Sequence, residues 1–111
     1  MSDLEQVRDV YDRKDDVQIL DVREPYEWEA GRIDGAIHVP LNDLMGGKGA
    51  DQLDPEKPVA VICRSGNRSE LASLMLKAKG FDAYNVRGGM EGWDREGLPY
   101  TTPSGEPGRV A

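Results

Sequence analysis

The sequence predicts an α/β domain in which a central, mostly parallel sheet is flanked by helices on both faces. Two observations carry this prediction. Strand-like and helix-like segments alternate along the chain, and residues 58–62 (PVAVI) form the continuous apolar run that is typical of a parallel strand covered on both sides. In sheets of this kind, ligands bind beyond the carboxyl ends of the strands. The residues that follow Ile62 are therefore the first candidates for a functional site.

The N-terminal segment predicts a helix followed by a short strand. Apolar residues recur at helical spacing over residues 2–13, and Ser2 is placed to cap this helix. A buried strand is expected at residues 17–20. The apolar face of the helix consists of Leu4, Val7, Val10 and Tyr11.

The next segment supplies a second helix and a second strand. Pro25 suits the first turn of a helix that runs to about Ala30 and ends at Gly31. Residues 36–39 are expected to form a short strand. Residues 42–57 are rich in Gly and Pro, which predicts a loop with at most one helical turn.

A longer helix is predicted over residues 67–79. Asn67 is the expected cap, Glu70 would complete a capping box, and Gly80 is the expected stop. Its apolar stripe would face the sheet. The members of that stripe are Leu71, Leu74, Met75 and Ala78.

The C-terminal segment predicts a strand at residues 81–86 and a short helix at residues 90–95. Pro, Gly, Ser and Thr dominate from Thr101 onward, so this segment is expected to be poorly ordered. We therefore expect one domain over residues 1–100 and a C-terminal tail over residues 101–111.

Length and composition limit the classes of function. A chain of 111 residues has room for one domain. No apolar run approaches the roughly 18 residues that a membrane span needs, and the first residues lack the features of a signal peptide. We expect a cytoplasmic protein with no membrane partner. The formal net charge of −7 argues against nucleic acid as a partner.

The chain contains one cysteine and one histidine. A single cysteine excludes an internal disulfide and a dithiol redox pair within one chain. Cys63 and His38 alone cannot supply a standard zinc site. We therefore expect no metal and no organic cofactor, and any thiol chemistry has to use one sulfur.

The segment after the buried strand combines a cysteine, a tight polar loop and a helix start. The backbone amides of such a loop can converge on one point, and the helix start adds partial positive charge. Both effects favour a thiolate, which is the nucleophilic form of cysteine. A buried cysteine before a turn is the plainer interpretation, but two arginines in one short segment favour an anion-binding loop. The candidates are Cys63 as nucleophile and Arg64, Ser65, Gly66, Asn67 and Arg68 as substrate-binding residues.

This arrangement suits attack on a small anion held against the sulfur. The fork of Arg64 or Arg68 can bind an oxyanion through two parallel hydrogen bonds. Transfer of sulfane sulfur from thiosulfate to the thiolate, with sulfite as the leaving group, fits this description. The expected partners are a small anionic sulfur donor and, as acceptor, cyanide, a small thiol or a protein.

Four segments in order resemble the signatures of the rhodanese family, and together they span about residues 17–98. The resemblance implies an α/β fold with a central parallel sheet, a persulfide cycle on Cys63, and substrate binding by residues 64–68. Two residues depart from the family pattern, since Arg32 and Asp34 stand where His and Pro are common. The four segments are residues 19–28 (ILDVREPYEW), 31–41 (GRIDGAIHVPL), 63–69 (CRSGNRS) and 85–93 (NVRGGMEGW).

Charged residues after the first strand are expected to support the site. Asp21, Arg23 and Glu24 are interpreted as a salt-bridge or hydrogen-bond framework that holds the loop, because buried charges need partners. His38 is interpreted as a structural or surface residue, and Trp28 and Trp93 as core residues.

Three alternative functions remain. A phosphatase or arsenate reductase of the same fold has five residues between cysteine and arginine, whereas four separate Cys63 from Arg68 here, and the smaller ring favours sulfur. A regulatory anion-binding module would not need Cys63. A persulfide carrier between two proteins would use the same loop, and the sequence does not distinguish it from a thiosulfate sulfurtransferase.

Overall fold

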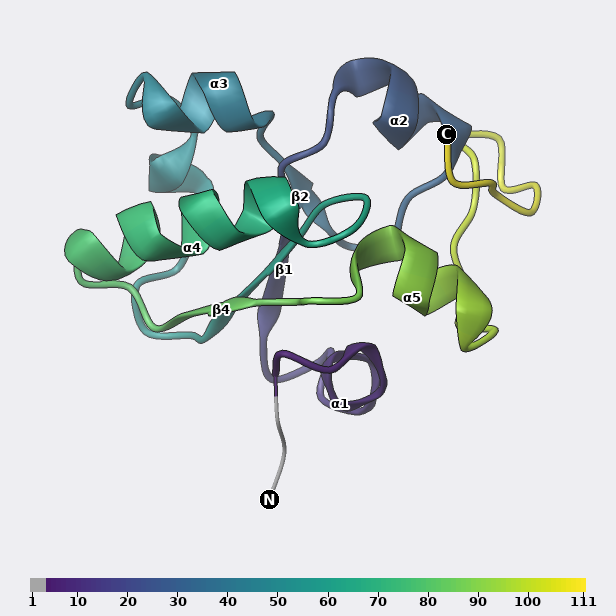
Figure 1. Ribbon diagram of the computed structural model, residues 1–111, viewed down its shortest axis with the longest axis horizontal. Coiled ribbons are helices and arrows are strands. Elements are labelled where there is room, and N and C mark those ends of the chain that lie inside the picture. The colour runs from purple at the N-terminus through teal and green to yellow at the C-terminus, as the bar shows by residue number, and fades with distance from the viewer. Residues whose placement is uncertain (1–3) are drawn as a thin grey trace.

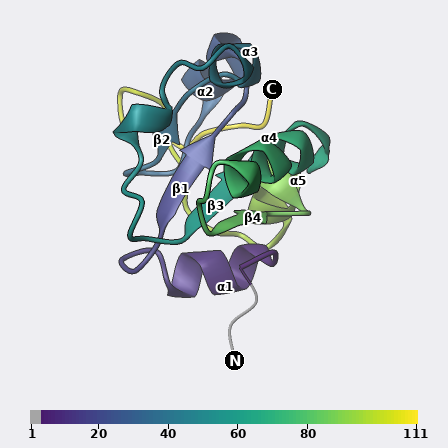
Figure 2. The same cartoon turned by 90° about the vertical axis from the view of Figure 1, so that its left-hand side faces the viewer.

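The computed structural model describes residues 4–111 (Figure 1). Its strands form one parallel sheet in the order β2-β1-β3-β4, which Figure 2 shows with all four strands labelled. The strands are β1 (Gln18–Asp21), β2 (Ile37–His38), β3 (Val59–Ile62) and β4 (Ala83–Asn85). In register, Leu20 of β1 lies opposite Ile37 of β2 on one side and Val61 of β3 on the other. The α/β fold with a parallel sheet is as the sequence predicts.

Alternate residues of each strand enter two separate hydrophobic clusters, one on each face of the sheet. Ile19, Ala60 and Ile62 face the cluster that includes residues of α1 (Val7–Asp12) and α5 (Gly89–Arg95). Leu20 and Val61 face the cluster covered by α3 (Leu41–Met45) and α4 (Asn67–Ala78). The sheet is therefore covered on both faces, as expected for a strand that reads VAVI without alternation.

The remaining helix, α2 (Pro25–Ala30), lies with α3 toward the end of the sheet opposite α1 (Figure 2). All four strands point toward this end, because every pairing is parallel. A 3₁₀ turn at Ala50–Gln52 and α3 occupy the segment expected to be mainly loop. Ser2, the expected cap of the first helix, lies outside the described residues.

Helix α4 packs on the sheet through a face that the sequence does not predict. Leu71 and Leu74, expected in the core, are 49% and 56% exposed, and Ala78 is exposed as well. Met75, the remaining member of the predicted stripe, is partly buried against the cluster covered by α3 and α4. Apart from Leu76, the fully buried side chains are smaller and more polar than predicted. The buried residues of α4 are Ser69, Ala72, Ser73 and Leu76.

The expected cap of α4 is also wrong. Asn67 is the first helical residue, and the cap position is taken by Gly66, whose φ of +105° suits glycine. No side chain caps this helix start, so Glu70 completes no capping box. The loop is instead closed by contacts to the cysteine sulfur and to β4, described below.

The C-terminal segment is ordered against the rest of the molecule, so the expectation of poor order is wrong. Arg32 and Thr101 exchange two backbone hydrogen bonds of 2.9 and 3.0 Å, and the Arg109 N–H donates to the carbonyl of Ala30 at 3.0 Å. Tyr100 and Val110 pack against the cluster that contains Trp93, which is fully buried as predicted. Two isolated β-bridges hold this segment, and neither extends into a strand. The sequence therefore shows no strand-like pattern here.

Among residues 4–111, no helix has the length and apolar character needed to cross a membrane.

Because Leu76 of α4 is buried and Leu74 is exposed, truncating each to alanine should change the free energy of unfolding by different amounts. Leu76→Ala should lower the free energy of unfolding by about 2–5 kcal/mol, since Leu76 is fully buried. Leu74→Ala removes the same atoms from the exposed face and should cost less than about 0.5 kcal/mol. Urea unfolding of both variants measures this difference. Equal losses would contradict the observed rotation of the helix.

Candidate active site

Cys63 follows β3 directly, at the carboxyl end of the sheet, and its side chain is fully buried. Its sulfur accepts a hydrogen bond from the Gly66 N–H at 3.1 Å and lies 3.3 Å from the hydroxyl oxygen of Ser69. We call Cys63, Gly66 and Ser69 the sulfur cradle. These contacts wrap the start of α4 around a single sulfur atom.

The cradle lowers the pKa of Cys63. Burial by itself raises that pKa, because it penalises the charged thiolate. The Ser69 hydroxyl and the backbone N–H groups of Ser69, Gly66 and Ser65 act in the opposite direction and prevail. Cys63 therefore reaches the nucleophilic thiolate form at a lower pH than an ordinary cysteine.

Two glycines make the loop geometry possible. A side chain at Gly66 would collide with the carbonyl oxygen of Arg87. Gly89 has a φ of +60°, and a Cβ there would lie 2.5 Å from the carbonyl oxygen of Arg64. The start of α5 thus packs against the loop, and the Met90 N–H donates to the carbonyl of Cys63 at 2.8 Å.

Asn85 connects the cradle to the end of β4, a role that the sequence does not predict although Asn85 begins the fourth signature segment. Its side-chain oxygen accepts from the Ser69 hydroxyl at 2.6 Å, and its side-chain nitrogen donates to the carbonyl of Gly66 at 3.2 Å. A hydroxyl carries one hydrogen, so Ser69 donates either to Asn85 or to the Cys63 sulfur. Ionisation of Cys63 therefore favours rotation of that hydroxyl toward the sulfur.

Arg68, predicted to bind substrate, points its guanidinium at Glu27 of α2. The two nitrogens of its fork lie 2.6 and 2.8 Å from the two carboxylate oxygens of Glu27. Burial raises the pKa of Glu27, but the hydrogen bonds and charge of Arg68 outweigh it and keep the pKa below its ordinary value. In the sequence, Glu27 is marked only by its place in the first signature segment. Nothing there indicates that it pairs with Arg68.

The three predicted supporting residues separate into two groups. Asp21 and Arg23 form a buried ion pair of 2.8 Å. Arg23 also donates to the carbonyls of Glu27 at 3.2 Å and Gly31 at 2.7 Å, so the pair reaches the loop only through α2. Glu24 is exposed and shares a reciprocal capping box with Glu27 at the start of α2.

The other residues of the loop and its surroundings carry fewer contacts with the sulfur. Ser65 and Asn67 have exposed side chains. Arg64 lies 3.5 Å from Glu91, with half of its side chain exposed. The substrate-binding roles of residues 64–68 stay predictions. Both arginines of the predicted anion-binding loop face a carboxylate, Glu27 for Arg68 and Glu91 for Arg64.

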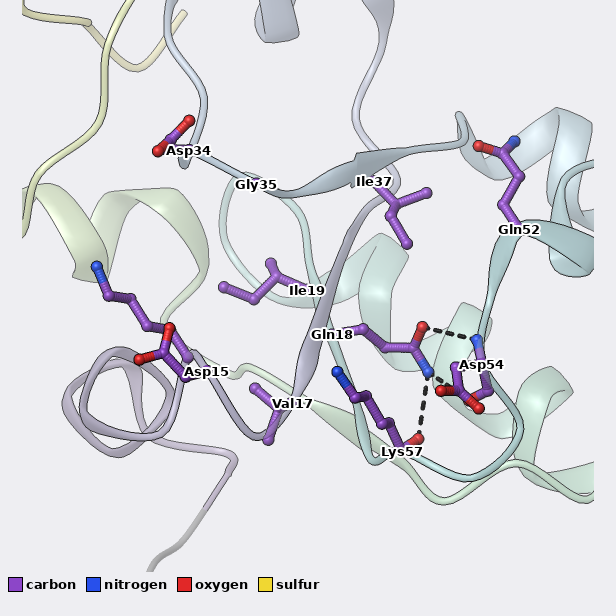
Figure 3. A pocket seen from close by; sticks show the side chains of 11 residues that line it. Asp15, Val17, Gln18, Ile19, Asp34, Gly35, Ile37, Gln52, Asp54 and Lys57 are labelled. Atoms are coloured by element: carbon purple, nitrogen blue, oxygen red, sulfur yellow. Dashed lines mark hydrogen bonds between the residues drawn. The ribbon is translucent and has the colours of Figure 1, made fainter.

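A pocket of about 470 Å³ lies at the other end of the sheet, near the start of β1 (Figure 3). Its lining combines Lys14 and Lys57 with Asp15, Asp34 and Asp54, and includes neither cysteine nor histidine. The Gln18 side chain lines this pocket and donates to the backbone carbonyls of Asp54 and Lys57 (Figure 3). Its side-chain oxygen accepts from the Asp54 N–H. The lining contains no cysteine, so the thiol chemistry is assigned to the cradle.

Within residues 4–111, no group of three His, Cys, Asp or Glu side chains is arranged to hold a metal ion. His38 stacks on Trp28 with ring centroids 4.5 Å apart, and its Nε2 lies 2.8 Å from the carbonyl oxygen of Arg23. These contacts agree with a structural role for His38. Trp28 is half-buried, so its predicted place in the core is wrong. Arg32, a departure from the family pattern, covers the Trp28 ring at 4.7 Å.

Comparisons with known proteins give one family and several relatives. A family model described as "Rhodanese-like domain" matches residues 4–96. A thiosulfate sulfurtransferase GlpE from Pseudomonas aeruginosa is 36% identical over 92% of the chain and 89% of its own length. A putative sulfur carrier protein YrkF from Bacillus subtilis is 38% identical over 81% of the chain, which spans only 48% of that relative.

A solved structure shows the same fold. The rhodanese-related protein from Thermoplasma volcanium matches with a TM-score of 0.81 and 35% identity, over 86% of this chain and 94% of that one. The probable adenylyltransferase/sulfurtransferase MoeZ from Mycobacterium tuberculosis is 33% identical, and the match covers 24% of its length. The matched segment therefore occurs both as nearly a whole protein and as part of longer ones.

The cradle predicts a shift in the pH dependence of thiol alkylation. Ser69→Ala removes a hydrogen-bond donor from the thiolate and should raise the pKa of Cys63, so the midpoint of the rate profile should move to higher pH. Stopped-flow alkylation with iodoacetamide across pH measures that midpoint. Ser73→Ala is the matched control, because Ser73 is also buried on α4 but bonds the carbonyl of Glu70. An unchanged midpoint in Ser69→Ala would contradict the assignment.

Proposed function

The chain belongs to the rhodanese-like domain family, and we propose that it is a sulfurtransferase that works through a persulfide on Cys63. It would move sulfane sulfur from a donor such as thiosulfate to a thiophilic acceptor, cyanide or a thiol. The observation that carries the proposal is the Cys63 sulfur bound by the Gly66 N–H and the Ser69 hydroxyl at the carboxyl end of β3. Relatives named as sulfurtransferases and as a sulfur carrier support the general class.

The chemistry needs one nucleophile and no oxidant. The Cys63 thiolate attacks the outer sulfur of thiosulfate, a new sulfur–sulfur bond forms, and the original bond breaks so that sulfite leaves with its electron pair. The acceptor then attacks the outer sulfur of the persulfide and regenerates the thiolate. The N–H groups that stabilise the thiolate would also stabilise the terminal sulfur of an ionised persulfide.

The residues around the cradle suit sulfur better than phosphate. Four residues separate Cys63 from Arg68, and the fork of Arg68 is already paired with Glu27. A phosphoryl group would need that fork for its equatorial oxygens. This pairing argues against the phosphatase and arsenate reductase alternatives.

A persulfide carrier is the second candidate. The relative named as a putative sulfur carrier protein is 38% identical to this chain, which spans about half of that relative's length. In this version, a protein or small thiol receives the sulfur, and turnover with cyanide is incidental. The cytoplasmic location and the identity of the acceptor stay predictions.

Intact-protein mass spectrometry tests the persulfide cycle. Incubation with a sulfur donor such as thiosulfate should add the mass of one sulfur atom, and cyanide should remove it. Cys63→Ala should show no gain, because Cys63 is the only cysteine of the chain. If no sulfane donor adds mass to the protein, the proposal that Cys63 is catalytic is contradicted. Removal by thiols but slow removal by cyanide would favour the carrier.

A further inference from the structure

We infer that Glu27 determines donor specificity, by neutralising Arg68 so that the cradle accepts sulfur from thiol-bound persulfides in preference to the dianion thiosulfate. This inference rests on the proposed function and names its substrate class. It assigns a role to a residue of α2 that itself makes no contact with the sulfur.

The guanidinium of Arg68 is committed to a protein carboxylate. Both oxygens of Glu27 accept from it, at 2.6 and 2.8 Å, in the parallel geometry that an oxyanion of a substrate would otherwise occupy. The side chain of Glu27 is 2% exposed and that of Arg68 is 32% exposed. A substrate that took the fork would leave Glu27 buried without its partner, which is a costly arrangement.

Glu27 is held in place from two further directions. Its Oε1 accepts a hydrogen bond from the Glu24 N–H at 2.9 Å. Its backbone carbonyl accepts from the buried guanidinium of Arg23 at 3.2 Å. The carboxylate therefore cannot easily swing away to release Arg68 for an incoming anion.

The other cations near the cradle also face carboxylates. Arg64 lies 3.5 Å from Glu91, and Arg87, whose carbonyl touches Gly66, lies 3.2 Å from Glu5. The chain as a whole carries a formal charge of −7. A dianion approaching a thiolate here is attracted mainly by amide dipoles and is repelled by the thiolate and the protein.

Two exposed side chains with apolar groups belong to the helices that carry Glu27 and Arg68. Tyr26, next to Glu27 on α2, is 68% exposed, and Leu71, one turn after Arg68 on α4, is 49% exposed. A carbon-bound sulfur donor has apolar groups to place against such residues, whereas thiosulfate has none. Charge and surface therefore favour the same class of donor.

The transfer from a persulfide is balanced without another reactant. The Cys63 thiolate attacks the outer sulfur of R–S–SH, and a new bond forms between these two sulfurs. The bond between the inner and outer sulfurs of the donor breaks. The leaving group RS⁻ carries away the electron pair, and Cys63 is left as a neutral persulfide. The donor enters as a neutral molecule and the negative charge of the Cys63 thiolate leaves on RS⁻, so no dianion has to be bound.

Paired alkylating reagents measure the charge at Cys63 independently of sulfur chemistry. Iodoacetate is an anion and iodoacetamide is neutral, so the ratio of their rate constants reports the local electrostatic environment. Glu27→Gln keeps the size of the side chain but frees the charge of Arg68, and should raise the ratio by about tenfold or more. Glu29→Gln removes one charge from an exposed position of the same helix and should leave the ratio within about twofold.

The same variants are then loaded with two sulfur donors. Native protein should be loaded faster by the persulfide of 2-mercaptoethanol than by thiosulfate at equal concentration. Glu27→Gln should increase the second-order rate constant with thiosulfate by about tenfold, with little change for the persulfide. An unchanged preference in a folded Glu27→Gln protein would overturn the inference.

Native protein supplies a test that does not depend on folding of the variant. With a neutralised Arg68, the iodoacetate-to-iodoacetamide ratio should stay level or rise when salt is added, because salt then screens only repulsion. A ratio that falls steeply with salt would show an uncompensated cation and overturn the inference. If the ratios behave as expected but neither donor loads sulfur, the proposed function fails while the charge effect of Glu27 stands.

Discussion

Asp21 and Arg23 form an ion pair at the end of β1 in which both side chains are buried. Two charges in the interior are stable only when their hydrogen-bonding capacity is filled. Arg23 fills it with the carboxylate of Asp21 and with the carbonyls of Glu27 and Gly31. The pair thereby fixes α2 over the carboxyl edge of the sheet. Removal of one member of such a pair typically costs about 3–5 kcal/mol, because the other charge is left buried.

The position of α2 decides what the active-site loop can do. Glu27 reaches from α2 to Arg68, and Arg68 lies in the first turn of α4, next to the cradle. The site is thus held by two successive ion pairs, one buried at the end of β1 and one partly exposed beside the sulfur. Helix α2 is held by the buried Asp21–Arg23 pair and carries Glu27. The same helix therefore contributes both to stability and to the charge beside the sulfur.

Amide and hydroxyl groups, more than cationic side chains, stabilise the thiolate. Desolvation opposes ionisation of Cys63, and the donors of Ser69, Gly66 and Ser65 outweigh it. A cradle of this kind fits one polarisable sulfur and its terminal neighbour, and it requires glycine where the loop touches Arg87 and α5. Asn85 supports it from β4 through the Ser69 hydroxyl and the Gly66 carbonyl, so three separate segments of the chain build the site.

The sequence by itself determined the parallel sheet, the position of Cys63 after β3 and the loop to α4, because apolar runs, glycines and their order are local signals. It did not determine which face of α4 is buried. Leu71 and Leu74 are exposed, and the buried positions of the helix include Ser69, Ala72 and Ser73. The contacts of Ser69 with Cys63 and Asn85 fix the rotation of the helix about its axis. Only the tertiary structure decided that Glu27 neutralises Arg68, a pairing across 41 residues that no spacing rule reveals. It also decided that residues 101–111 fold back on the chain, because backbone hydrogen bonds to Ala30 and Arg32 hold them without a hydrophobic pattern.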